Sequence, residues 1–172
     1  MRKFLLPLLF LALFISESLF VQFMPEKVFG QSKILVPHFL YAGLLFFTIY
    51  VGKNKGIIYS AIFGLLFDIV YVEVLGIYLF LFPFIAYLVT KVMQVMQSNL
   101  IVSSIVSLAG VALLEIGVYE MNFLIHVTDL EFMDFINLRF YPTLILNAIF
   151  ILLTGFLFKR YFEKVSEAMN DD

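Results

Sequence analysis

Six long apolar runs, separated by short polar breaks, account for most of this chain of 172 residues. A helix needs about 20 apolar residues to cross the hydrocarbon core of a bilayer. The pattern therefore predicts an all-α integral membrane protein, a bundle of six transmembrane helices in one domain that covers residues 1–172. The predicted spans are residues 4–23, 34–51, 57–72, 74–93, 100–125 and 138–158.

The breaks between the runs differ in character. Residues 52–56 (GKNKG) predict a tight polar turn, whereas Glu73 and Gly76 mark only a very short connection between the third and fourth spans. Residues 126–137 mix three carboxylates with large apolar side chains. That mixture predicts an amphipathic turn at the membrane interface and not a further span.

The first run admits two interpretations. Arg2 and Lys3 precede it and residues 16–18 (SES) interrupt it, as in a cleaved signal peptide. However, apolar residues resume at Leu19, which makes the run longer than the usual signal core of about 7–15 residues. We therefore favour a retained first span.

The composition supports a membrane environment. Hydrophobic residues make up 63% of the chain and charged residues 14%, against roughly 45–50% and about 25% in soluble domains. So much apolar surface cannot be buried in one small core, and lipid must act as the solvent. The chain has no cysteine, which excludes disulfides and thiolate chemistry.

The distribution of basic residues predicts the orientation. Cytoplasmic loops of membrane proteins carry an excess of lysine and arginine. With the amino terminus inside, eight basic residues lie on the cytoplasmic side and three on the outer side, so both termini are predicted to be cytoplasmic. The inner set is Arg2, Lys3, Lys53, Lys55, Lys91, Lys159, Arg160 and Lys164, and the outer set is Lys27, Lys33 and Arg139.

Three carboxylates stand out within the predicted spans, namely Glu17, Asp68 and Glu115. The helices that carry them all run outward in this orientation. At a rise of about 1.5 Å per residue, the three carboxylates lie at a similar depth, somewhat outside the midplane. A carboxylate at membrane depth costs at least roughly 2.5–3.5 kcal/mol, and by default it indicates a functional site.

The last span contributes polar residues to the same layer. Arg139 lies near its outer boundary, Thr143 follows on the same face, and Asn147 lies about 12 Å deeper than Arg139. We therefore predict that Arg139, Asn147 and the three carboxylates cluster inside the bundle. One arginine cannot neutralise three carboxylates, so some are expected to be protonated or paired by another polypeptide.

The third span offers a close-packing face. Ser60, Gly64 and Asp68 are spaced four residues apart, and the small Gly64 permits close approach of a neighbouring helix. Intramembrane polar residues also serve simply as hydrogen bonds between helices. A functional role and a packing role both stay open for these residues.

The other chemistry-bearing residues predict neither catalysis nor metal binding. His38 and His126 are expected to be exposed near the outer interface, and no histidine–carboxylate pair has metal-ligand spacing. The phosphate-binding glycine loop, the nucleophile elbow and the zinc-protease motif are absent. The basic residues are dispersed, which argues against nucleic-acid binding. We therefore predict a protein that is not an enzyme and uses no cofactor.

A series of short stretches also resembles a known family in order and spacing, along almost the whole chain. They are residues 2–7 (RKFLLP), 16–18 (SES), 35–40 (LVPHFL), 64–68 (GLLFD), 75–78 (LGIY), 114–115 (LE), 138–143 (LRFYPT) and 146–147 (LN). On these residues the chain resembles the MreD family of bacterial rod shape-determining membrane proteins, in the form of Gram-positive rods such as bacilli.

The resemblance implies a non-enzymatic subunit of the cell-wall elongation machinery in the bacterial cell membrane. It implies the bitopic protein MreC as a direct partner, with MreB filaments, the glycan polymerase RodA and a class B penicillin-binding protein in the same complex. It also implies a fold similar to the S-components of energy-coupling-factor vitamin transporters. The inner basic residues are expected to meet anionic membrane lipids. The candidate packing or partner-binding residues are Glu17, Gly64, Asp68, Glu115, Arg139 and Asn147.

Two other functions remain as alternatives. The first is a substrate-binding subunit of a small-molecule importer, which would carry an Ala-x-x-x-Ala motif in its first helix, whereas this helix has only Ala12. The second is an ion-coupled transporter that uses the three carboxylates. Such transporters have broken helices and a symmetric pair of spans interrupted by Gly or Pro, and the sequence predicts neither feature.

Overall fold

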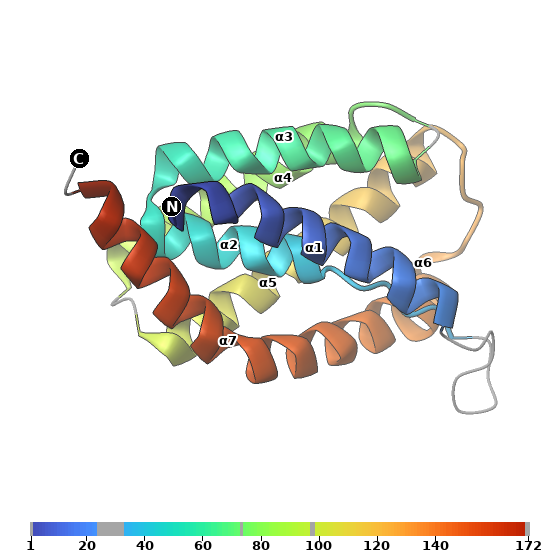
Figure 1. Cartoon of the computed structure of the whole chain (residues 1–172). Helices are drawn as coiled ribbons and strands as arrows, with labels where there is room; N and C mark the ends of the chain where they lie inside the picture. Colours follow the sequence, from blue (N-terminus) through green and yellow to red (C-terminus); the bar gives the residue numbers. More distant parts are fainter. Residues whose placement is uncertain (1, 24–32, 73, 97–98, 171–172) are drawn as a thin grey trace.

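The structure, a computed structural model, describes residues 2–23, 33–72, 74–96 and 99–170. Every regular element in these segments is helical, and six helices assemble into a bundle (Figure 1), which confirms the predicted all-α fold. Five of them are long and apolar enough to cross a membrane. The elements are α1 (Arg2–Phe23), α2 (Phe39–Val51), α3 (Lys53–Tyr71), α4 (Ile77–Val95), α5 (Leu100–Leu124), α6 (Phe132–Phe135), the π-helix η1 (Ile136–Phe140) and α7 (Tyr141–Asn170).

Helix α2 lies at the centre of the bundle and packs against α1, α3, α4, α5 and α7. Ten consecutive residues, 39–48, are buried, as expected for a helix that is apolar on all sides. With 13 residues it extends only about 20 Å, less than the roughly 30 Å of the hydrocarbon core. Residues 33–38 precede it in a non-helical conformation.

The prediction of a helix from residue 34 was therefore wrong at its start. Pro37 gives the local reason, because the residue before a proline is disfavoured in the helical conformation, and here that residue is Val36. The second span is thus a broken one, with an extended entry and a short central helix.

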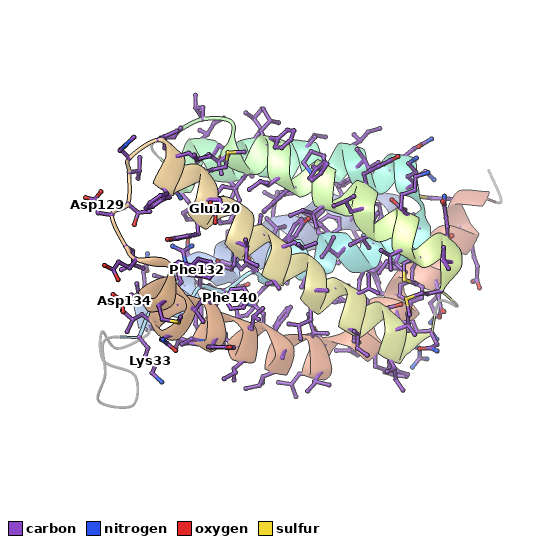
Figure 2. All side chains as sticks on the ribbon, turned by 180° about the vertical axis from the view of Figure 1, so that it is seen from behind. Lys33, Glu120, Asp129, Phe132, Asp134 and Phe140 are labelled. Atoms are coloured by element: carbon purple, nitrogen blue, oxygen red, sulfur yellow. The ribbon has the colours of Figure 1, made fainter. Side chains whose placement is uncertain are left out.

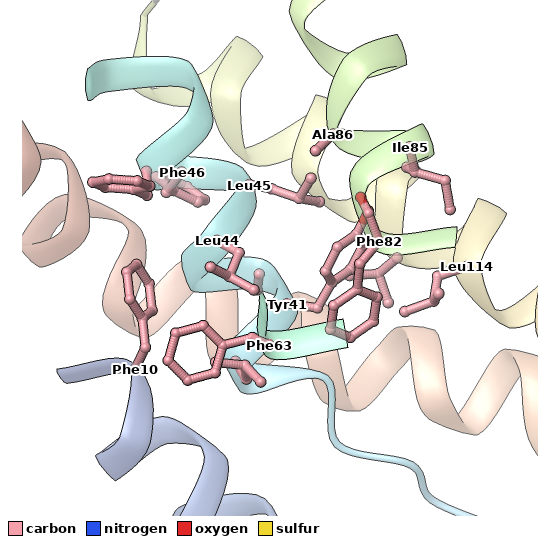
Figure 3. Close-up of a cluster of buried hydrophobic side chains, with 14 of the residues drawn as sticks. Phe10, Tyr41, Leu44, Leu45, Phe46, Phe63, Phe82, Ile85, Ala86 and Leu114 are labelled. Atoms are coloured by element: carbon pink, nitrogen blue, oxygen red, sulfur yellow. The ribbon is translucent and has the colours of Figure 1, made fainter. Parts of the chain in front are cut away.

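Aromatic side chains fill the core around α2 (Figure 3). Phe10 of α1 packs edge-on against Phe47 and Phe63, with ring centroids 5.4 and 5.5 Å apart. Tyr41 stacks on Phe82 of α4 at 4.2 Å. Because lipid is as apolar as these side chains, close packing and not hydrophobic transfer holds the helices together.

Helices α3 and α4 form the most closely packed pair. A Cβ atom at Gly64 would lie 2.5 Å from the Tyr78 carbonyl oxygen, so only glycine allows this approach. The turn before α4 needs a second glycine, Gly76, whose φ of +113° is a conformation that other residues rarely adopt. Gly64 therefore packs against the chain's own fourth helix.

Gly64→Ala is expected to lower the free energy of unfolding by about 1–3 kcal/mol, because backbone atoms of α4 would have to move. Denaturation in mixed micelles, followed by helical circular dichroism, would measure the change. Gly117→Ala is the matched control, since its new methyl group would meet only the flexible Leu81 side chain at 3.0 Å. An equal loss in both variants would contradict the close α3–α4 contact.

The two ends of the bundle carry different charge. The start of α1 and the end of α7 lie at the same end (Figure 1), whereas Glu120, Asp129 and Asp134 lie at the other (Figure 2). The bundle thus has an acidic end opposite its termini.

Other helix bounds differ from the predicted spans as well. Helix α7 continues to residue 170, well past the predicted end at residue 158, and α4 begins at 77 instead of 74.

The segment between α5 and α7 is amphipathic. Phe135 of α6 is 1% exposed and stacks on Tyr119 with ring centroids 4.1 Å apart, whereas Phe132 and Met133 are exposed. His126 is exposed as well. A helix of four residues cannot cross a membrane, in keeping with the predicted interfacial turn.

Candidate functional site

The extended segment 33–38 obtains its hydrogen bonds from α7. Non-helical backbone at membrane depth is tolerated only where the protein itself satisfies the N–H and C=O groups. The Val36 N–H donates to Thr143 Oγ1 at 3.1 Å. Asn147 Nδ2 donates to the Val36 carbonyl at 3.0 Å, and Asn147 Oδ1 accepts from the His38 N–H at 2.8 Å. Two α7 side chains thus replace the partners that a helix would supply.

A proline in α7 leaves one more backbone acceptor free for this segment. Pro142 has no N–H, so the carbonyl oxygen of Leu138, four residues earlier, loses its usual helical donor. The Ile34 N–H donates to that oxygen at 2.8 Å. The π-helix η1 ends at Phe140, two residues before this proline, and π-helical turns are rare and often mark functional sites.

Glu115 of α5 is the centre of a buried ionic group. Arg139 of η1 donates from Nε to Glu115 Oε2 at 2.8 Å and from Nη2 to Oε1 at 3.3 Å. His38 Nε2 lies 2.5 Å from the same Oε1. The Glu115 and His38 side chains are fully buried, whereas Arg139 is 27% exposed. The arginine therefore reaches the buried carboxylate from the surface of the bundle.

Asp68 of α3 caps the amino-terminal end of α4. Its carboxylate accepts hydrogen bonds from the N–H groups of Gly76, Tyr78 and Leu79, each at 2.9 Å. The first N–H groups of a helix have no helical acceptor, and a negative charge is favourable at that end. Asp68 is thus a capping residue that joins α3 to α4.

Glu17 of α1 caps the amino-terminal end of α2, but only one of its two carboxylate oxygens accepts a hydrogen bond from the part of the chain that the structure describes. The Leu40 N–H donates to Glu17 Oε1 at 2.8 Å. The side chain is 4% exposed, and its Oε2 is buried without a hydrogen-bond partner among the described residues. Glu17 therefore has one buried oxygen that no described residue hydrogen-bonds.

A cavity of about 340 Å³ adjoins Glu17. It lies between the end of α1, the extended segment and the end of α3, on the side of the bundle away from the termini. The Ser18 and Tyr71 hydroxyl groups, which are hydrogen-bonded to each other, belong to its wall. We call it the outer cavity, and it is lined by Glu17, Ser18, Val21, Gln22, Val36, Pro37, Phe67 and Tyr71.

Comparison with known proteins identifies the family. Residues 2–165 match the family model described as rod shape-determining protein MreD. The chain belongs to the MreD family. The rod shape-determining protein MreD of Bacillus subtilis (strain 168) is 31% identical over 172 residues, which is the full length of both chains. The cell shape-determining protein MreD of Streptococcus pneumoniae is 30% identical over 128 residues, 74% of this chain and 78% of that protein.

No solved structure matches this member of the MreD family. The likeness to S-components of vitamin transporters therefore stays a prediction.

The polar residues of this MreD-family chain form two groups and not one. Glu17, Glu115, Arg139 and Asn147 all contact each other or residues 36–40. Asp68 and Gly64 lie instead at the α3–α4 junction, where both meet the first residues of α4. Backbone N–H groups, which the charge count of the sequence omitted, are the partners of Glu17 and Asp68.

His38 is the member that sequence reasoning missed. The expectation of an exposed imidazole was wrong, because His38 is fully buried and contacts Glu115. Pro37, the residue before His38, could have indicated this position, because it breaks the helix and leaves backbone groups that need polar neighbours. A histidine placed directly after such a break is a candidate for the same polar layer.

Proposed function

We propose that this chain acts in the determination of rod cell shape, as a non-enzymatic membrane scaffold of the cell-wall elongation machinery. Membership of the MreD family is the observation that carries the proposal, supported by a full-length relative named rod shape-determining protein. Five helices that are long enough to span a bilayer agree with a multi-pass protein of the cell membrane. In this role the chain works by holding other membrane proteins in position.

The proposed partners are those of the family resemblance. MreC binds directly, and MreB filaments, RodA and a class B penicillin-binding protein belong to the same complex. Both termini lie in the cytoplasm, with the acidic end of the bundle outside. The excess of eight basic residues over three supports this orientation, and so does the common end shared by the start of α1 and the end of α7.

The contacts of the buried polar residues favour a scaffold over a catalyst. Asp68 and Asn147 are engaged with the chain's own backbone, and Glu115 is paired with Arg139 and His38. Such bonds hold a broken span and a helix start in place. They support a rigid framework.

We assign the direct partner contact to the outer cavity. Its wall is mostly apolar and includes Glu17, whose buried Oε2 lacks a hydrogen-bond partner among the described residues. A buried polar atom of this kind is costly unless a hydrogen-bond partner reaches it. A segment of MreC that presents apolar side chains and one hydrogen-bonding group fits these requirements.

The alternative functions gain nothing from these contacts. The family and both relatives carry names of shape determination, and neither name mentions import. The broken second span does not favour an ion-coupled transporter, because Thr143, Asn147 and Glu17 already bond its backbone groups. The scaffold therefore remains the function with the most support.

Complementation tests the proposal. A rod-shaped Bacillus depleted of its own MreD-family protein is expected to round up, and expression of this chain is expected to restore rods. Vitamin-dependent growth with normal shape after depletion would point to the importer alternative. Rounded cells despite full membrane levels of the chain would contradict the scaffold.

A further inference from the structure

Two lysines lie within cation–π distance of one tyrosine ring at the end of the bundle opposite the outer cavity. Lys53 Nζ, at the start of α3, lies 4.7 Å from the centroid of the Tyr87 ring. Lys91 Nζ, one helical turn after Tyr87 on α4, lies 5.6 Å from the same centroid. The two ammonium groups are thus no more than about 10 Å apart, which is one Debye length at 0.1 M salt.

Neither lysine has an acidic partner among the described residues. Within the described segments, no carboxylate lies within ion-pair distance of Lys53 or Lys91, whereas Lys159 pairs with Glu163 at 3.8 Å. Like charges held close together repel each other, and a tyrosine ring attracts each ammonium by only about 0.5–1 kcal/mol at an exposed site. The arrangement is complementary to an anion between the two lysines.

The surroundings add to the positive potential. Lys53 is the first residue of α3, and its N-cap, Gly52, supplies no side-chain hydrogen bond to the first turn. The free N–H groups of a helix start carry a partial positive charge that attracts phosphate. The start of α3 therefore adds positive potential beside Lys53.

The depth of the site fits a lipid headgroup. Lys55, two residues after Lys53, contacts Met169 near the end of α7, so the site lies at the end of the bundle that holds both termini. Tyr87 is 38% exposed and lies within the last three turns of α4. Tyrosine is enriched at membrane interfaces, where its ring lies at headgroup level.

We propose that Lys53, Lys91 and Tyr87 bind the phosphate of an anionic phospholipid from the leaflet next to the termini. The phosphate lies between the two ammonium groups, and the acyl chains run along the exposed apolar side of α3 and α4, where Ile58, Ile62 and Phe84 face outward. A lipid with net negative charge is preferred, because a choline group would repel the same lysines.

Lipid retention by the full chain in detergent tests the site. Native mass spectrometry would compare phosphatidylglycerol with phosphatidylcholine for the wild type and for Lys53→Gln/Lys91→Gln. We expect the double variant to need roughly tenfold more phosphatidylglycerol for half-occupancy. Lys159→Gln/Lys164→Gln is the matched control, which removes the same charge at the same end and is expected to change retention less than about twofold.

Each other outcome contradicts the proposal. Unchanged lipid retention in Lys53→Gln/Lys91→Gln, at an unchanged melting temperature, would show that these two lysines do not bind the lipid. An equal loss in the control variant would leave only diffuse attraction to the basic end. Displacement of the bound lipid by soluble glycerol phosphate would assign the lysines to a free phosphate compound instead of a lipid. Tyr87→Leu serves as a second variant and is expected to weaken retention while both lysines remain.

Discussion

Replacement of Asp68 by leucine is expected to lower the free energy of unfolding by about 3–5 kcal/mol. The carboxylate accepts three hydrogen bonds from the start of α4, and leucine would leave these buried or part-buried N–H groups without acceptors. Denaturant titration in mixed micelles, followed by helical circular dichroism, would measure the loss. Unfolding would also abolish the proposed binding of MreC indirectly, so loss of MreC after Asp68→Leu would not identify a contact surface.

Asp134→Leu is the control for this prediction. Asp134 is an exposed aspartate on α6, and its replacement is expected to change stability by less than about 0.5 kcal/mol. A similar small effect at Asp68 would mean that the start of α4 is held by other contacts. The close approach at Gly64 would then be the main link between α3 and α4.

The second large effect is expected at Arg139. Arg139→Met is expected to cost about 3–5 kcal/mol, because Glu115 would keep a buried charge with only His38 beside it. Glu115→Gln is expected to cost less, since Arg139 is 27% exposed and can turn toward the membrane surface. The free energies of unfolding of both variants would establish this order.

A double-mutant cycle isolates the pair. Arg139→Met combined with Glu115→Gln is expected to be more stable than Arg139→Met alone, because the uncompensated charge is gone. Strictly additive losses would show that Arg139 and Glu115 do not stabilise each other. Glu120→Gln, at an exposed position on α5, serves as the control for removal of a carboxylate.

Much of this architecture could be predicted from the sequence. Long apolar runs identified the helices, because a membrane span needs a fixed number of apolar residues. The spacing of Ser60, Gly64 and Asp68 indicated one face, and all three are buried. These features depend on local composition and helical geometry, which a single sequence displays directly.

The contacts that complete the fold could not be predicted in the same way. The extended entry to α2 is stable only because Thr143 and Asn147, more than a hundred residues later, bond its backbone. The partner of Glu17 is a backbone N–H of α2, which no charge count reveals. Pro37 and Pro142 gave local hints of broken backbone, but their effect depends on how α2 and α7 pack.

The outer cavity offers the most direct test of the scaffold. Val21→Trp would fill the cavity from its rim and leave the bond between Glu17 and the Leu40 N–H in place. Ile15→Trp is the matched control on the same helix. The exposed fractions of Val21 and Ile15 are 57% and 55%, and Ile15 is not among the residues that line the cavity.

The decisive measurement is cell shape and MreC co-purification in a Bacillus depleted of its own MreD-family protein. We predict that the wild type and Ile15→Trp restore rods and co-purify with MreC. Val21→Trp, at equal membrane level, is predicted to leave the cells round and to lose MreC. Rod-shaped cells that retain MreC with Val21→Trp would contradict the account.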